Sequence, residues 1–202
     1  MSIWVCVGSG PSLVPDDLDF VREQGWRIAT CNMGFTICPD ARVFHAMDSA
    51  WWEQYGDEAL ETLRPDCQVW TGSDDVASEG KARLLTWDGE QGYSDTVGHC
   101  HGGKLSGLQL INIVGWYQPT LVILLGYDNM ARHGQQHWHQ DYPEGMRNGG
   151  TVDQRDGDYA AMLRTAPFPI VNCSRRTNIL DSIPRMKLTD AAAMAMKPVE
   201  VH

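Results

Sequence analysis

The chain has 202 residues, of which 43% are hydrophobic and 21% are charged, a balance that excludes disordered and collagen-like proteins. Its 16 Lys and Arg residues stand against 26 Asp and Glu residues, so the formal net charge is -10. Such a surface repels phosphate backbones and anionic membranes, and we expect no extended nucleic-acid binding.

Short apolar runs alternate with segments of helical spacing, which predicts an α/β fold around a largely parallel sheet. The predicted strands are Ile3–Val7, Arg27–Cys31, Arg42–Ala46, Gln68–Thr71, Arg83–Trp87, Thr120–Leu125 and Pro169–Cys173. The predicted helices are Asp16–Gln24, Ser49–Leu63, Lys104–Tyr117 and Asp158–Arg164.

Cap residues and apolar faces refine these helices. Asp16 or Asp17 is expected to cap the first helix, and Ser49 the second, with Glu53 inside its first turn. The helix over 104–117 is apolar on more than one face, so we expect it to be buried.

Two stretches interrupt the alternation of strands and helices, residues 72–80 and residues 129–150. The second is rich in Gly, His, Gln and Asn, and a segment of about 20 residues without predicted structure is typical of a lid or binding loop. We therefore expect a single domain over 1–190 with a mobile lid at about 129–150. Residues 191–202 are expected to form a flexible tail or a frayed helix.

The cysteines and the first residues indicate the compartment. None of the six cysteines forms a Cys-x-x-Cys pair, and several lie in apolar runs, so we expect reduced thiols. The first residues carry no basic leader, and the longest aliphatic run, Leu121–Leu125, is too short to span a bilayer. These features predict a cytoplasmic protein without an export signal or membrane span.

A glycine-rich motif follows the first predicted strand. Glycines at the carboxyl end of a strand let the backbone turn sharply and approach a ligand closely. The motif lacks the third glycine of the dinucleotide fingerprint and the Gly-Lys-Ser/Thr of a P-loop, so it indicates either a different nucleotide loop or a tight turn. Its residues are Gly8, Ser9, Gly10, Pro11 and Ser12.

Three further positions follow predicted strands or begin the buried helix. Asn32 offers a donor and an acceptor to a base or sugar, or it is a turn residue. Ser106-Gly107 with Lys104 forms either a phosphate site at a helix start or the helix start alone. Gly126 precedes Asp128, which would orient a hydroxyl or a metal-bound water, or form an Asx turn.

Histidines gather in the predicted lid. They supply a general base near neutral pH, ligands of a metal site, or polar loop residues, and their spacing matches no standard zinc signature. We assign no metal ligand. The residues are His133, His137 and His139 with Asp141, and upstream His99 and His101.

Tryptophans could form an acceptor platform or belong to the core. Trp51, Trp52 and Trp116 fit either role, and the core is the expectation for Trp116. Trp138, inside the predicted lid, is expected to contact a ligand.

The order of these motifs resembles the bacterial sialyltransferases of the Campylobacter type and the related MptE-like 6-hydroxymethylpterin diphosphokinase-type proteins, which are often found in phage and capsule loci. The resemblance covers roughly residues 3–188. Four blocks carry it: Gly8-Ser9-Gly10-Pro11-Ser12-Leu13, Cys31-Asn32, Ser106-Gly107 followed by residues 121–128, and Asn172-Cys173-Ser174 with Asn178-Ile179-Leu180.

This resemblance implies a Rossmann-like sheet with helices on both faces that binds a nucleotide-activated donor. It implies that the glycine loop lies near the nucleotide, Asn32 near its sugar or base, and Ser106-Gly107 beside the phosphate. In the sialyltransferases a lid histidine deprotonates the acceptor hydroxyl, and His139 or His137 is the nearest match. The paired tyrosines that assist the leaving phosphate in that family have no clear match in this sequence. Tyr142 is the nearest equivalent, and His133 is the alternative.

Our leading hypothesis is a glycosyltransferase that moves a sugar from a nucleotide sugar to a hydroxyl of a small molecule or glycan. In it, Lys104 and a lid arginine, Arg132 or Arg147, stabilise the departing phosphate. One alternative is Mg²⁺-dependent diphosphate transfer from ATP to a pterin-like alcohol, for which Asp48, Asp128 and Asp141 would hold the ion. Another is a non-catalytic nucleotide-binding phage accessory protein. The sequence leaves homo-oligomer formation open.

Overall fold

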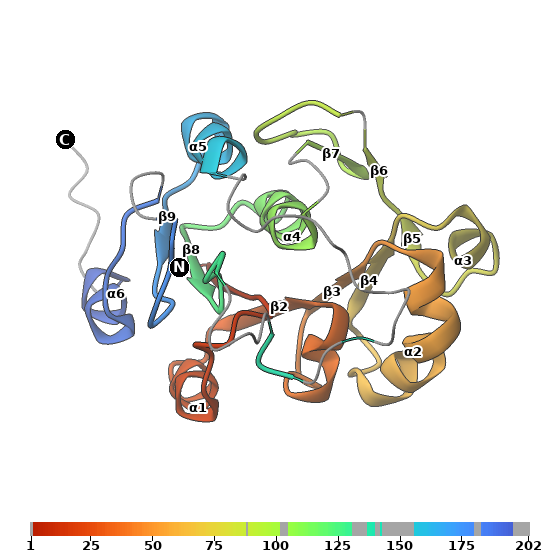
Figure 1. Cartoon of the computed structure of the whole chain (residues 1–202), viewed down its shortest axis with the longest axis horizontal. Coiled ribbons are helices and arrows are strands. Elements are labelled where there is room, and N and C mark those ends of the chain that lie inside the picture. The colour runs from red at the N-terminus through yellow and green to blue at the C-terminus, as the bar shows by residue number, and fades with distance from the viewer. Residues whose placement is uncertain are drawn as a thin grey trace.

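The computed structural model describes residues 2–87, 89–101, 105–130, 137–139, 142, 156–179 and 183–195. Strands and helices alternate along them (Figure 1). The strands are β1 (Ile3–Val7), β2 (Arg27–Cys31), β3 (Val43–Ala46), β4 (Gln68–Thr71), β5 (Arg83–Leu84), β6 (Thr86–Trp87), β7 (His99–Cys100), β8 (Leu121–Leu125) and β9 (Ile170–Asn172). The helices are α1 (Pro15–Glu23), the 3-10 helix η1 (Asn32–Thr36), α2 (Ser49–Thr62), α3 (Asp74–Ser78), α4 (Ser106–Gly115), α5 (Asp156–Thr165) and α6 (Leu188–Ala195).

Seven of these strands form one parallel sheet in the order β5-β4-β3-β2-β1-β8-β9, and β6 pairs with β7 in a small second sheet. Strand β1 lies at the centre, with Val5 opposite Ile28 of β2 and Ile123 of β8. Both faces of β1 are buried, since Trp4, Val5 and Cys6 are all shielded from solvent. The sequence of this strand is a continuous apolar run, as expected for a parallel sheet that is covered on both faces.

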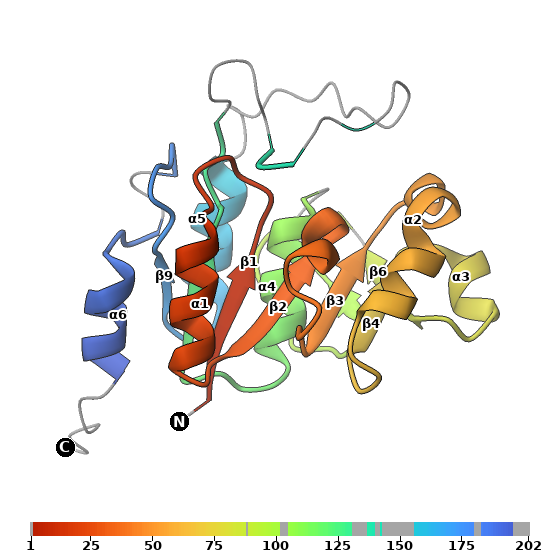
Figure 2. The same ribbon diagram turned by 90° about the horizontal axis from the view of Figure 1, so that it is seen from below.

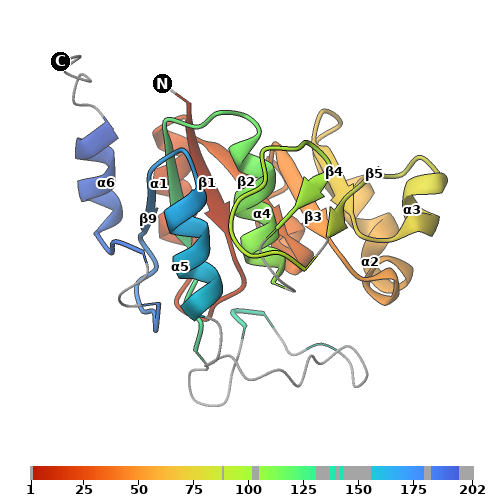
Figure 3. The same cartoon turned by 90° about the horizontal axis from the view of Figure 1, so that it is seen from above.

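Helices cover both faces of the sheet, as the sequence predicts (Figures 2 and 3). Val5 and Val7 point to the face that packs against α1, α2 and α6, whereas Cys6 points to the face covered by α4 and α5. The fold is therefore Rossmann-like. The predicted burial of α4 is confirmed, because every residue from Leu108 to Gly115 is buried.

Both predicted helix caps are wrong. Helix α1 is capped by Val14, because Pro15 has no N–H to satisfy and its fixed φ suits the first helical position. Helix α2 is capped by Asp48 rather than Ser49, and Glu53 falls beyond its first turn. Helix α1 begins one residue before its predicted start, whereas α2 begins at Ser49 as predicted, and in both helices the residue before the first helical position is the cap.

Two predicted elements also differ. The strand predicted over Arg83–Trp87 is divided, because Leu85 turns into the core and the chain passes from the large sheet to the small one. The stretch 72–80 contains the short helix α3.

Helix α6 extends through residues 191–195 with Ala191 and Ala192 buried, so it occupies the start of the predicted tail. The rest of that tail and most of the predicted lid lie outside the described residues.

Candidate functional site

The strand order changes direction at the β1–β8 pair. From β1 the chain moves outward through β2, β3, β4 and β5 on one side, and β8 and β9 lie on the other side (Figure 1). In open α/β sheets, ligands bind at the carboxyl ends of the strands where this reversal occurs. The residues that follow β1 and β8 are therefore the first candidates for a site.

The turn after β1 packs directly against the turn after β8. The Gly8 N–H donates to the Leu125 carbonyl over 2.8 Å, and the Gly10 N–H donates to the Gly126 carbonyl over 2.8 Å. A Cβ at Gly8 would lie 2.7 Å from the Gly126 oxygen, and a Cβ at Gly10 would lie 2.5 Å from Cγ of Asp128. Gly126 itself has a φ of +67°. Close packing of the two turns thus accounts for all three glycines.

Asp128 holds the glycine turn in place. Its carboxylate accepts hydrogen bonds from the Ser12 N–H at 2.7 Å and from the Ser12 hydroxyl at 2.6 Å, and only 2% of Asp128 is exposed. The same arrangement buries Ser12, and Pro11 lies between it and Gly10. These bonds let Asp128 anchor the turn, and its role as a catalytic carboxylate stays a prediction.

Two of the predicted lid histidines lie over this turn. Nδ1 of His137 is 2.9 Å from the Ser9 hydroxyl oxygen, and the Trp138 N–H donates to the Ser9 carbonyl over 2.9 Å. The His139 ring stacks on the His137 ring with centroids 4.9 Å apart and an interplanar angle of 2°. Residues distant in the sequence, Ser9 and the histidine pair, thus come together at the carboxyl edge of β1.

Tyr142 completes this cluster. Its ring meets the rings of His137 and His139 edge to face, at 5.5 and 5.1 Å between centroids. Burial raises the pKa of the Tyr142 phenol well above its ordinary value, and the nearby Cys31 and Tyr55 raise it further. Tyr142 therefore also lies beside the end of β2 and beside α2.

Asn32 begins η1 directly after β2, with a left-handed φ of +50°. Asn tolerates this conformation better than most residues, and such backbone geometry is enriched at functional sites. The neighbouring Met33 packs against the same core cluster as Tyr142, and its backbone forms a hydrogen bond with Tyr142. Asn32 therefore lies in the region of the sheet edge that holds the histidine pair.

The start of α4 packs against the end of β8. The Tyr127 hydroxyl donates to the Gly107 carbonyl over 2.9 Å, and a Cβ at Gly107 would lie 2.9 Å from the Tyr127 ring. Burial raises the pKa of the Tyr127 phenol well above its ordinary value. Ser106 and Gly107 are half-buried here, whereas Lys104 and His133 lie outside the described residues, as do Arg132, Asp141 and Arg147.

A polar network after β9 was missed by the sequence reasoning, although its residues were part of the resemblance. The Tyr127 N–H donates to the Ser174 hydroxyl at 2.7 Å, and the Thr177 hydroxyl donates to the Tyr127 carbonyl at 2.8 Å. The Asn172 amide oxygen accepts from the Ser174 N–H at 2.9 Å. The sequence signal for this network is the group of polar residues Asn172, Ser174 and Thr177, which fall within six positions at the end of an apolar strand. The structure buries all three.

The other candidates lie elsewhere. His99 pairs with Thr86 in the small sheet, with Nδ1 2.8 Å from the hydroxyl oxygen, and its ring centroid is 6.1 Å from that of His101. Asp48 is exposed at the start of α2. Within the described ranges, no three His, Cys, Asp or Glu side chains are grouped as a metal site.

The tryptophans divide between core and surface. Trp51 and Trp52 are buried, and Trp116 packs against Trp70 and donates from Nε1 to the Ser94 carbonyl at 2.9 Å. Trp138 is half-buried against the core, and among the residues that the structure describes its buried Nε1 has no hydrogen-bond partner. Its contact with a ligand stays a prediction.

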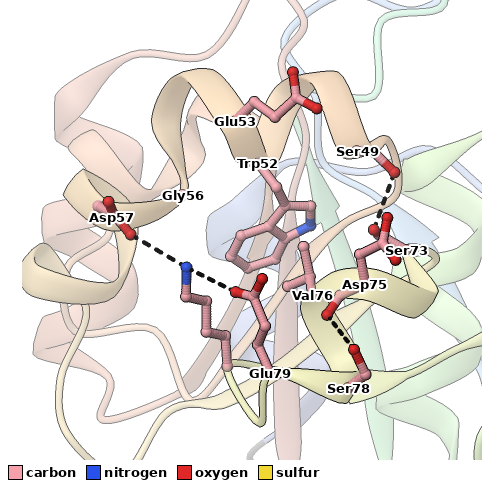
Figure 4. A pocket seen from close by; sticks show the side chains of 11 residues that line it. Ser49, Trp52, Glu53, Gly56, Asp57, Ser73, Asp75, Val76, Ser78 and Glu79 are labelled. Carbon is pink, nitrogen blue, oxygen red and sulfur yellow. Dashed lines mark hydrogen bonds and ion pairs between the residues drawn. The ribbon is translucent and has the colours of Figure 1, made fainter.

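A pocket of about 370 Å³ lies between α2 and α3 (Figure 4). Trp52 and Val76 line it, and the Ser49 hydroxyl donates to the Ser73 hydroxyl at its rim over 3.0 Å. The Lys81 ammonium, also in its lining, pairs with the carboxylates of Glu79 at 3.0 Å and Asp57 at 3.7 Å. Trp52 was a candidate for the acceptor platform, but no predicted catalytic or nucleotide-binding residue in the described part of the chain lines this pocket.

Comparisons with protein-family models, with curated proteins and with solved structures found no match for this chain. Among the helices that the structure describes, none is long and apolar enough to cross a membrane.

Proposed function

We propose that this protein is a transferase that uses a nucleotide-activated donor, specifically a glycosyltransferase that moves a sugar from a nucleotide sugar to a hydroxyl acceptor. One observation carries the proposal: the His137–His139 pair lies on the Ser9 turn, at the sheet edge where the strand order reverses. That edge is where Rossmann-like sheets bind nucleotides, and imidazole is the side chain best suited to take a proton near pH 7.

In the proposed reaction an imidazole of this pair accepts the proton of the acceptor hydroxyl. The acceptor oxygen forms a bond to the anomeric carbon of the donor sugar while the bond from that carbon to the phosphate oxygen breaks, and the nucleotide leaves with the electron pair. The Ser9 hydroxyl fixes the His137 ring, and the edge-to-face contacts of Tyr142 fix both ring planes. Proton transfer by a positioned base contributes typically 10²–10⁴-fold in rate.

Nucleotide binding is tested first, by thermal shift with CMP, CDP, UDP, GDP and ATP, each with and without Mg²⁺. A ligand at 100 times its Kd stabilises the folded state by about 2.7 kcal/mol, which a melting curve detects. A Mg²⁺-independent shift with CMP is the expected result. A shift with ATP that requires Mg²⁺ would instead favour diphosphate transfer, and no shift with any nucleotide would overturn the proposal.

The base is tested by His137→Asn and His139→Asn, with His101→Asn as the matched control. His101 is half-buried and lies outside the site, so its replacement should leave the transfer rate unchanged. We expect at least one site variant to lose about 10²–10⁴-fold in kcat while the nucleotide-induced shift in Tm remains. Full turnover by both site variants would exclude the histidine pair as the base.

A further inference from the structure

The loop that follows β9, residues 173–179 and here named the β9 loop, lies beside the proposed nucleotide site. The Cys173 N–H donates to the Leu124 carbonyl at 2.9 Å, and the Asn178 N–H donates to the Asp128 carbonyl at 2.8 Å. Both acceptors belong to the end of β8 or to the turn that follows it. The β9 loop therefore borders the same reversal point as the Ser9 turn.

Buried polar groups hold this loop rigidly. Asn172, Ser174 and Thr177 are each at most 6% exposed, and their side chains bond to one another and to the Tyr127 backbone. The Ile179 N–H also donates to the Thr177 hydroxyl, at 3.0 Å. A fully connected buried network of this kind is costly to assemble and fixes one geometry, which is how proteins support a functional group in an adjacent position.

Two consecutive arginines lie on this rigid loop, and the structure gives them different roles. Arg175 forms a two-pronged ion pair with Asp17 of α1, with Nε and Nη2 each 3.0 Å from a carboxylate oxygen. Its carbonyl accepts a hydrogen bond from Arg185. Arg175 therefore joins the β9 loop to the helix that follows the glycine turn.

Within the described ranges, Arg176 has no such partner. It is exposed, and its guanidinium makes no ion pair with the residues that the structure describes. The carboxylates at this edge are those of the buried Asp128 and of Asp16 and Asp17 in the first turn of α1, of which Asp17 is already paired with Arg175. A phosphate bound here would be repelled by these carboxylates unless a cation were supplied.

We infer that Arg176 and the β9 loop form the phosphate-binding subsite of this protein, taking the phosphate group of a nucleotide donor. The inference rests on the proposed function for the nucleotide itself. Guanidinium recognises phosphate through two parallel hydrogen bonds, and a rigid supporting loop lowers the entropy lost when that contact forms. Support of such a loop is a role for the three buried polar residues at the end of β9 and after it, Asn172, Ser174 and Thr177.

The test is isothermal titration calorimetry at low ionic strength with inorganic pyrophosphate, CMP and cytidine. Arg176→Gln should weaken binding of pyrophosphate and CMP about tenfold, since a hydrogen bond to a charged group contributes this much, and should leave cytidine unchanged. Arg176→Lys keeps the positive charge but not the paired N–H groups of the guanidinium, so it should recover part of the affinity for pyrophosphate and CMP that Arg176→Gln loses. The control is Arg164→Gln, an exposed arginine in the last turn of α5, which should bind all three probes like the parent protein.

The outcomes separate the two proposals. If Arg176→Gln binds pyrophosphate and CMP as tightly as the parent protein, the subsite is overturned and the transferase proposal stands. If pyrophosphate binds through Arg176 but no nucleotide shifts the Tm, the subsite stands and the transferase proposal is overturned. If the parent protein binds neither pyrophosphate nor any nucleotide, both are overturned.

Discussion

At the residue scale, the tightest constraint lies where the turns after β1 and β8 meet. A methyl group at Gly10 would lie 2.6 Å from the Gly126 carbonyl oxygen, which is backbone and cannot rotate away. Gly10→Ala should therefore lower the free energy of unfolding by about 1–3 kcal/mol in urea titrations. Gly157→Ala is the control, because its added methyl meets nothing within 4 Å and it lies in α5, so it should raise stability by up to about 1 kcal/mol. Equal losses in both variants would contradict the packing argument.

The bond between Ser12 and Asp128 is the second residue-scale feature that can be measured. Because the acceptor is a buried carboxylate, Ser12→Ala should cost about 1.5–3 kcal/mol of unfolding free energy. Ser78→Ala removes an exposed hydroxyl that donates to a carbonyl one turn earlier, and should cost less than about 0.5 kcal/mol. Chemical denaturation gives the loss of unfolding free energy in Ser12→Ala and in Ser78→Ala. Similar losses in the two variants would show that Asp128 does not anchor the turn.

At the scale of elements, His45 joins β3 to its neighbours. Its ring nitrogens lie 2.9 Å from the Gln109 amide oxygen on α4 and 3.3 Å from the Trp70 carbonyl on β4, and burial lowers the pKa of His45. The folded state therefore holds the neutral ring, while the unfolded chain binds a proton at an ordinary pKa of about 6.5. Stability is fully present above that pH and falls below it, by up to about 1.4 kcal/mol per pH unit for one group.

Urea titrations between pH 5 and 8 test this prediction. His45→Gln should be less stable at pH 8 but should lose less stability on acidification than the parent protein, because the group that binds the extra proton on unfolding is gone. His101→Asn should keep the parent slope. If His45→Gln retains that slope as well, His45 is not the group responsible.

At the scale of the whole molecule, the two cores on either side of the sheet protect the thiols. None of the six cysteines, all of which the structure describes, is in a disulfide; Cys67 is half-buried, and Cys6, Cys31, Cys38, Cys100 and Cys173 are buried. Burial raises the pKa of Cys67 to about 12, so even this thiol should be a weak nucleophile at pH 8. With Ellman's reagent the folded protein should react at one thiol at most and slowly, whereas all six should react in urea. Rapid reaction of several thiols without urea would show that one core opens readily.

Much of the architecture follows from the sequence alone. Continuous apolar runs such as Leu121–Leu125 predict strands covered on both faces, and the all-round apolar pattern over residues 104–117 predicts a buried helix, because each pattern is local and strong. The positions of the glycine turn and of Asp128 at strand ends are likewise predictable, since parallel strands share one carboxyl edge. Helix caps were not, because Pro15 and the local backbone outweigh the side-chain preferences.

The tertiary structure decided what those residues do. The sequence allowed Asp128 to be a reactive carboxylate or an Asx-turn residue, and the folded structure adds that its oxygens accept hydrogen bonds from Ser12, 116 positions away in the chain. The contact of His137 with Ser9 and the bonds of the β9 loop to Tyr127 also join segments far apart in sequence. Pairings of this kind depend on strand order and on which turns meet at the sheet edge. Periodicity determines which residues are buried, but only the folded sheet determines which polar groups satisfy one another and which, like Arg176 on the β9 loop, remain exposed.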